Sequence, residues 1–129
     1  MTSKLEETKP YVIKFEDRAD YLYAYAQAPK DSYEISLDFW TQIALRCKEN
    51  GFSKVLVEED FGTDNSTIDM YELVSQGHQI GLTGVKIAFV DRHLTQIDNN
   101  LFGETVARNR GLFAKVFTDI KKAEAWLLS

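Results

Sequence analysis

The chain has 129 residues, a formal net charge of −5 and a sequence pI near 5.0. This acidic balance argues against a surface for nucleic acids or anionic membranes, because such surfaces need concentrated lysine and arginine. Cys47 is the single cysteine, which excludes an internal disulfide and a cysteine-based metal cluster.

Residues 1–10 are polar, end in Pro10 and lack the apolar core of a signal peptide. No apolar run approaches the roughly 20 residues of a membrane-spanning helix. We therefore expect a flexible leader over residues 1–10 and one domain over residues 11–129, in a cytoplasmic protein that does not insert into membranes.

Two β-prone runs begin the domain. Residues 11–15 form the first, and the second, residues 21–28, alternates large and small side chains. A period of two places the tyrosines of the second run on one face and its leucine and alanines on the other. The two runs predict an antiparallel hairpin whose small-residue face receives a helix.

Helices and strands then alternate. Ser36 is a candidate N-cap of a first helix, which ends at Asn50-Gly51 because glycine tolerates a positive φ. The apolar stripe of this helix consists of Trp40, Ile43, Ala44 and Cys47. A buried strand is predicted over residues 52–58, an acidic loop over residues 59–65 and a second helix from Ser66.

The remaining elements repeat this alternation. Residues 85–90 predict a strand, Asp98 is a candidate cap of a third helix that ends at Asn109-Arg110-Gly111, and residues 112–117 predict the last strand. Asp119 precedes a final helix with an apolar face of Ile120, Ala123, Trp126 and Leu127. The order ββαβαβαβα predicts an α/β fold with a mixed sheet, in which the first hairpin is antiparallel and the later strands are parallel.

Four segments carry a resemblance to a known family: residues 52–58 (FSKVLVE), 85–91 (VKIAFVD), 102–111 (FGETVARNRG) and 116–127 (VFTDIKKAEAWL). With the element order, they resemble the STAS domain, and in particular the SpoIIAA-like proteins, the fold of anti-sigma-factor antagonists. The resemblance implies a protein-interaction or regulatory module without catalytic activity, cofactor or metal.

In the antagonists, a serine at the start of the helix after the third strand is phosphorylated. The resemblance makes Ser66 the candidate phosphoacceptor, and a helix N-terminus would stabilise a phosphate there. The usual setting is Asp-Ser, then Ser or Thr, then Gly, whereas here Asn65 separates Asp64 from Ser66 and no glycine follows. The alternative is that Ser66 is an N-cap, and we expect a module without an intact phospho-switch motif.

Acidic residues gather where α/β folds place their ligands, beyond the carboxyl end of a strand. Glu58, Glu59, Asp60 and Asp64 follow one strand, and Asp91 and His93 follow the next. The alternatives are a solvated, partner-facing patch, a Mg²⁺ or Ca²⁺ site, although the spacing matches no calcium loop, and a catalytic pocket with His93 as an acid–base group. The sequence offers no nucleophile motif beside them, so we expect no enzyme activity.

The tyrosine face, Tyr21, Tyr23 and Tyr25, is a candidate contact surface because tyrosine combines apolar area with a polar tip. We expect Tyr11 and Phe15 from the neighbouring strand to join it. Its alternatives are a homodimer or partner contact, a pocket for a small apolar or lipid-like ligand, and a face simply covered by the leader or a helix.

Overall fold

The computed structural model describes residues 11–29, 33–62, 67–93 and 97–129, with some side chains inside the helices left undescribed. One five-stranded sheet has the order β1-β2-β3-β4-β5. Strand β1 (Val12–Asp17) is antiparallel to β2 (Leu22–Ala28), while β3 (Lys54–Phe61), β4 (Lys86–Asp91) and β5 (Phe113–Phe117) run parallel to β2. The predicted mixed sheet is confirmed.

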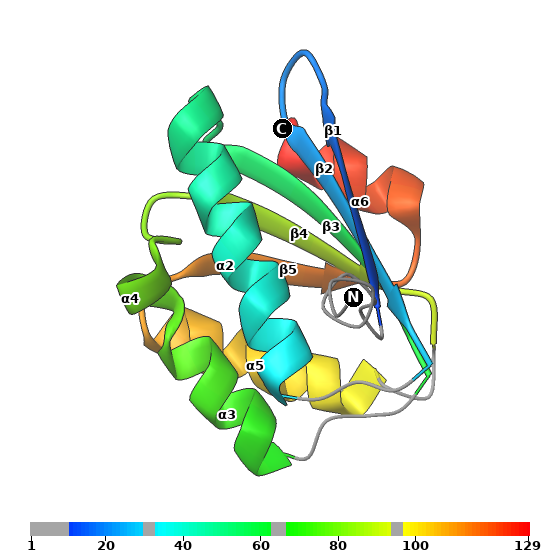
Figure 1. The fold of residues 1–129 in the computed structure, drawn as a ribbon, viewed down its shortest axis with the longest axis vertical. Helices are drawn as coiled ribbons and strands as arrows, with labels where there is room; N and C mark the ends of the chain where they lie inside the picture. Colours follow the sequence, from blue (N-terminus) through cyan, green and yellow to red (C-terminus); the bar gives the residue numbers. More distant parts are fainter. Residues whose placement is uncertain (1–10, 30–32, 63–66, 94–96) are drawn as a thin grey trace, which may run out of the picture.

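Helices lie on both sides of this sheet (Figure 1). Helices α2 (Tyr33–Asn50), α3 (Thr67–Ser75), α4 (Gly77–Ile80) and α5 (Ile97–Asn109) lie on one side, and α6 (Ile120–Leu127) lies on the other. The predicted α/β order is confirmed, with the short α4 as an addition between α3 and β4. Among the described residues, no helix has both the length and the apolar composition to cross a membrane.

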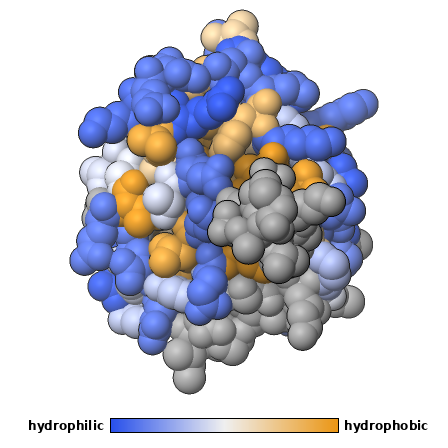
Figure 2. Space-filling view, in the orientation of Figure 1, coloured by the Kyte–Doolittle hydropathy of each residue, from blue (hydrophilic) through white to orange (hydrophobic). Residues whose placement is uncertain are grey.

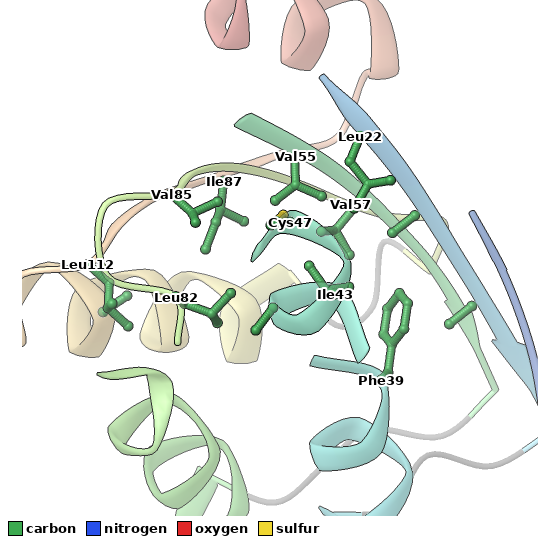
Figure 3. Close-up of a cluster of buried hydrophobic side chains, with 14 of the residues drawn as sticks. Leu22, Phe39, Ile43, Cys47, Val55, Val57, Leu82, Val85, Ile87 and Leu112 are labelled. Atoms are coloured by element: carbon green, nitrogen blue, oxygen red, sulfur yellow. The ribbon is translucent and has the colours of Figure 1, made fainter. Parts of the chain in front are cut away.

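The larger core lies between α2 and the sheet (Figure 3). Strand β2 contributes a fully buried leucine and three alanines, as its alternation predicts, and α2 contributes Phe39, Ile43, Ala44 and Cys47. Alanines on this face of β2 leave room for the helix to approach, and α2 contacts β2. Ile43, Ala44 and Cys47 are buried as predicted, whereas at the start of the stripe Phe39 is fully buried and Trp40 is only half-buried.

A smaller core lies beneath α6. It consists of Tyr21, Leu56, Ala88, Val90, Ala123 and Leu127. Asp119 caps α6, because its carboxylate accepts hydrogen bonds from the backbone N–H groups of Lys121 and Lys122. The predicted burial of Ile120 is wrong, since this side chain is 39% exposed at the first position of the helix.

Helix ends were predicted better than helix starts. Gly51 and Gly111 have φ values of 74° and 79°, the left-handed conformation that ends α2 and α5 where expected. In contrast, α2 begins at Tyr33, so Ser36 is buried inside its first turns rather than capping it. Likewise α5 begins at Ile97, which places Asp98 within the first turn.

The acidic loop is also shorter than predicted, because β3 continues to Phe61. Glu58, Glu59 and Asp60 are therefore strand residues, and successive strand residues point to opposite faces of the sheet. Glu58 and Asp60 share the α6 face, while Glu59 lies on the α2 face beside Asp91. Asp64, Ser66 and the leader, residues 1–10, lie outside the described residues.

Candidate functional site

An apolar cavity of about 100 Å³ lies between the sheet and the helices α2, α3, α4 and α5. Strands β4 and β5 form its floor. The apolar lining residues are Trp40, Leu73, Val74, Ile80, Leu82, Ile87, Phe89, Ala107, Leu112, Ala114 and Val116. Four polar side chains join them: Ser36, Glu59, Asn100 and Glu104.

The cavity arises because the helices on this side do not cover the sheet evenly. Helix α2 packs over β2, and α3 packs mainly against α5 rather than against a strand. Small residues on the walls, Gly103, Ala107 and Ala114, leave the space between them open. Gly77 allows α4 to approach Leu112 closely, since a Cβ at this position would lie 2.3 Å from the Leu112 Cδ1 atom.

Buried polar groups gather near the carboxyl ends of β3 and β4. Glu59 and Asp91 are neighbours in the β3–β4 register and are 7% and 6% exposed. The Asn100 side-chain amide donates to Asp91 Oδ2 at 2.9 Å, and the His93 backbone N–H donates to Asp91 Oδ1 at 2.8 Å. These bonds tie the start of α5 to the end of β4 and fix the Asn100 amide at the cavity wall.

Glu104 lines another wall of the cavity and also binds β5 at the edge of the sheet. Its Oε1 atom accepts the backbone N–H of Val116 at 2.6 Å. Its Oε2 atom lies 3.6 Å from the guanidinium of Arg108, one turn further along α5. One carboxylate thus joins α5 to β5.

The tyrosine face lies on the opposite side of the sheet, and α6 covers part of it. Tyr21 is buried, and its hydroxyl donates to Glu124 of α6 and accepts from Arg18. Tyr23 and Tyr25 are half-buried further along β2. The ring of Tyr21 is therefore covered by α6, whereas the rings of Tyr23 and Tyr25 are partly accessible.

A network of paired charges surrounds the accessible part. Arg92 Nε lies 2.7 Å from Glu58 Oε2, and Arg92 Nη1 lies 3.8 Å from Asp60 Oδ2. The Tyr23 hydroxyl donates to Glu58, and Arg92 lies over the ring of Tyr25. Burial, and then the bond to Glu58, raises the pKa of Tyr23, while the Glu58 bond raises the pKa of Arg92.

Asp91 and His93, considered above as parts of one pocket with the acidic residues, direct their side chains to different partners. The His93 imidazole pairs with Asp60, with Nε2 2.7 Å from Oδ1, on the wall of a second, wider cleft. The Asp91 carboxylate is instead directed to Asn100 of α5. The cleft measures about 490 Å³ and is lined by Tyr11, Val12, Gln27, Ala28, Pro29, Asp60, Gly62 and His93.

The prediction that Tyr11 and Phe15 join the tyrosine face is also wrong. Phe15 pairs with Ala24 in the hairpin register, which places it on the α2 side, where Arg46 lies over its ring. Tyr11 packs against the same core, and its hydroxyl donates to Asp38 of α2. This bond raises the pKa of Tyr11 to about 12.

Two features were not predicted from the sequence. Arg92 lies at the centre of the charged network, and Asn100 and Glu104 line the cavity. Asn100 is buried although its side chain is polar, and this burial becomes visible only in the structure. The described site residues fall into two groups on opposite faces of the sheet: Glu59, Asp91 and Asn100 on one, and Tyr23, Tyr25, Glu58, Asp60 and Arg92 on the other.

No protein-family model matches the chain, and no curated protein matches its sequence. Among solved structures, the chain is similar to a protein of the DUF3478 family from Shewanella loihica PV-4, described as having a SpoIIAA-like fold. The two are 18% identical, the similarity covers 91% of this chain and 93% of that one, and the TM-score is 0.47. The likeness concerns the fold alone.

Proposed function

We propose that this chain is a non-enzymatic binding module that holds a small apolar molecule in the cavity beneath α3 and α4. The observation that carries the proposal is the cavity itself, whose walls are mainly apolar and include four polar side chains. Ligand sites in proteins are typically concave and apolar, with a few placed polar groups that orient the ligand.

The volume of the cavity limits the size of the ligand. A cavity of about 100 Å³ is somewhat smaller than a dry engineered cavity of ~150 Å³ that accepts benzene. Long acyl chains therefore do not fit in the space as it stands. The ligand is therefore a compact molecule rather than a lipid.

The test is a titration of ¹⁵N-labelled protein with dissolved xenon, a monatomic probe that enters small apolar cavities, followed by ¹H–¹⁵N correlation spectra. We expect shifts confined to the backbone signals of lining residues, such as Leu73, Ile87 and Leu112. An Ala114→Ile variant, whose larger side chain occupies the cavity, should lose these shifts. The proposal is wrong if xenon at millimolar concentration perturbs no lining residue, or if Ala114→Ile responds as the wild type does.

A second candidate function is docking of a protein partner or of a second copy on the accessible tyrosine face. One observation favours it. Arg92 pairs with Glu58 and Asp60 and lies over the ring of Tyr25, yet its side chain is half exposed. Tyrosine and arginine beside one another are enriched at protein interfaces.

Light scattering over a concentration series tests self-association through this face. We expect a concentration-dependent mass increase in the wild type that Arg92→Ala reduces. Arg108→Ala is the matched control, because Arg108 is similarly exposed on α5, on the other side of the sheet. A mass of one chain at every concentration would contradict docking of a second copy, and equal effects of both variants would contradict the assigned face.

A further inference from the structure

We infer that a short acidic peptide of a partner protein docks on an aromatic and basic patch between α6 and the edge strand β5. This patch consists of the rings of Phe113, Phe117 and Trp126 together with Lys86 and Lys115. The apolar cavity lies on the other face of the sheet, and the tyrosines lie on β2, so the inference depends on neither function proposed above.

The register of β5 places its alternate side chains beside α6. Phe113, Lys115 and Phe117 share one face of the strand because successive residues point to opposite faces. Lys115 is the neighbour of Ala88 in β4, and Ala88 lies in the core beneath α6. The Trp126 ring of α6 meets the Phe113 ring at 5.3 Å and the Phe117 ring at 5.6 Å between centroids. The three rings therefore form one cluster at the edge of the sheet.

Much of this apolar surface is exposed. Phe113 is 57% exposed, the largest value among the large apolar side chains that the structure describes, and Phe117 and Trp126 are only half-buried. Ile120 and Leu128 add exposed apolar area at the two ends of α6. Exposed apolar side chains that gather in one place, rather than singly, are typical of interaction sites.

The cations of the patch have no carboxylate partner. Among the described side chains, several arginines pair with carboxylates of the same chain: Arg18, Arg46, Arg92 and Arg108. In contrast, no described side-chain carboxylate lies within ion-pair distance of Lys115, or of Lys86, which donates to the backbone oxygens of Trp126 and Ser129. The patch therefore offers positive charge that the chain itself does not neutralise with a side chain.

The carboxylates of the α6 segment are bonded elsewhere. Asp119 accepts the backbone N–H groups of Lys121 and Lys122 as the cap of the helix. Glu124 accepts the hydroxyl of Tyr21, which lies at the start of β2. A carboxylate of a partner that approaches the patch thus meets ammonium groups without having to displace a carboxylate of this chain.

The positions of the ammonium groups favour a peptide over a nucleic acid. Lys86 Nζ lies 4.6 Å from the centroid of the Trp126 ring and 5.5 Å from that of Phe113, and Lys115 Nζ lies 5.5 Å from that of Phe117. Bases of single strands bind by stacking on ring faces, and here an ammonium group already lies over each ring. The net charge of −5 also repels an extended polyanion or an anionic membrane, whereas a short peptide covers only the patch.

The experiment measures fluorescence anisotropy of a short labelled peptide in which aspartates alternate with leucines. We expect saturable binding, and about tenfold weaker binding when asparagine replaces every aspartate, because at least two exposed ion pairs are then lost. Lys115→Gln should weaken binding about two- to fivefold. Phe113→Ser should weaken it about fivefold or more, because it removes the most exposed apolar contact.

The matched controls lie on α2, on the other side of the sheet (Figure 1). Leu45→Ser removes an apolar side chain that is 54% exposed, and Lys48→Gln removes an exposed ammonium group. Both should leave the affinity unchanged. Circular dichroism confirms that all four variants are folded, which their exposed or half-buried positions favour.

Equal affinity for the aspartate and asparagine peptides would overturn the inference, as would wild-type affinity in folded Phe113→Ser and Lys115→Gln proteins. Tighter binding of oligothymidine or of phosphatidylserine vesicles than of the peptide, at the same salt concentration, would assign the patch to a different partner and overturn it too. Light scattering covers a second copy of the chain: a mass that rises with concentration and no longer rises in Phe113→Ser would make the patch a dimer contact instead.

Discussion

Filling the cavity provides the sharpest test of the packing. Ala114 lies on β5, is half-buried and lines the cavity floor, so Ala114→Ile directs three additional carbon atoms into the empty space. At about 0.8 kcal/mol for each buried methylene-sized group, the gain in transfer free energy is about 2.4 kcal/mol. The cavity volume gives a similar upper limit, since 100 Å³ at roughly 24 cal/mol per Å³ is also about 2.4 kcal/mol.

Ordering the isoleucine side chain costs about 0.5–1 kcal/mol, so the net increase in unfolding free energy should be about 1.5 kcal/mol. Isoleucine also suits a strand. Urea denaturation followed by circular dichroism measures this increase, and the melting temperature should rise by roughly 5 °C for a chain of this size.

Ala24→Ile is the matched control. It introduces the same side chain into the same sheet, but Ala24 is fully buried beneath α2 and does not line the cavity. We expect this variant to lose about 1–3 kcal/mol through overpacking. If Ala114→Ile loses as much free energy as Ala24→Ile, the space above Ala114 is not empty and the reasoning about the cavity fails.

Three further predictions concern buried and capping groups. Asn100→Ala should lower the unfolding free energy by about 1–3 kcal/mol in urea denaturation, because the buried Asp91 carboxylate loses its amide donor; an unchanged midpoint would show that this bond contributes nothing. Asp119→Ala should cost about 0.5–2 kcal/mol by leaving two N–H groups at the start of α6 without their acceptor, and the exposed Asp20→Ala is its control. Burial raises the pKa of Cys47 from 9.0 to about 11, so the neutral thiol stabilises the fold below about pH 9 and this contribution disappears as the pH rises to 11. The urea midpoint should therefore fall over this range, and less steeply in Cys47→Ala; equal slopes would contradict the assignment.

The strands and helix ends could be predicted because local signals determine them. The alternation of tyrosine and alanine in β2 follows directly from the pleat of a strand, and Gly51 and Gly111 end helices through their own backbone conformation. The start of α2 could not be located from Ser36, because a serine can also be buried inside a helix once tertiary packing surrounds it.

The candidate site was less predictable because it depends on the spatial arrangement of separate elements. The sequence indicated acidic residues near the ends of β3 and β4, but the length of β3 decides which face each one occupies. The cavity had no sequence signal, since it arises where α2, α3 and α5 meet over β4 and β5. The hairpin register, which no local pattern specifies, placed Phe15 on the α2 side.

The bond from Glu104 to the Val116 N–H has a consequence for assembly. Strand β5 is the last strand of the sheet, and the outer N–H groups of such a strand can pair with a strand of another chain. At Val116 that position is already occupied by a carboxylate from the same chain. An incoming strand would have to displace Glu104 first, so this side chain protects the molecule against sheet extension and aggregation at the β5 edge.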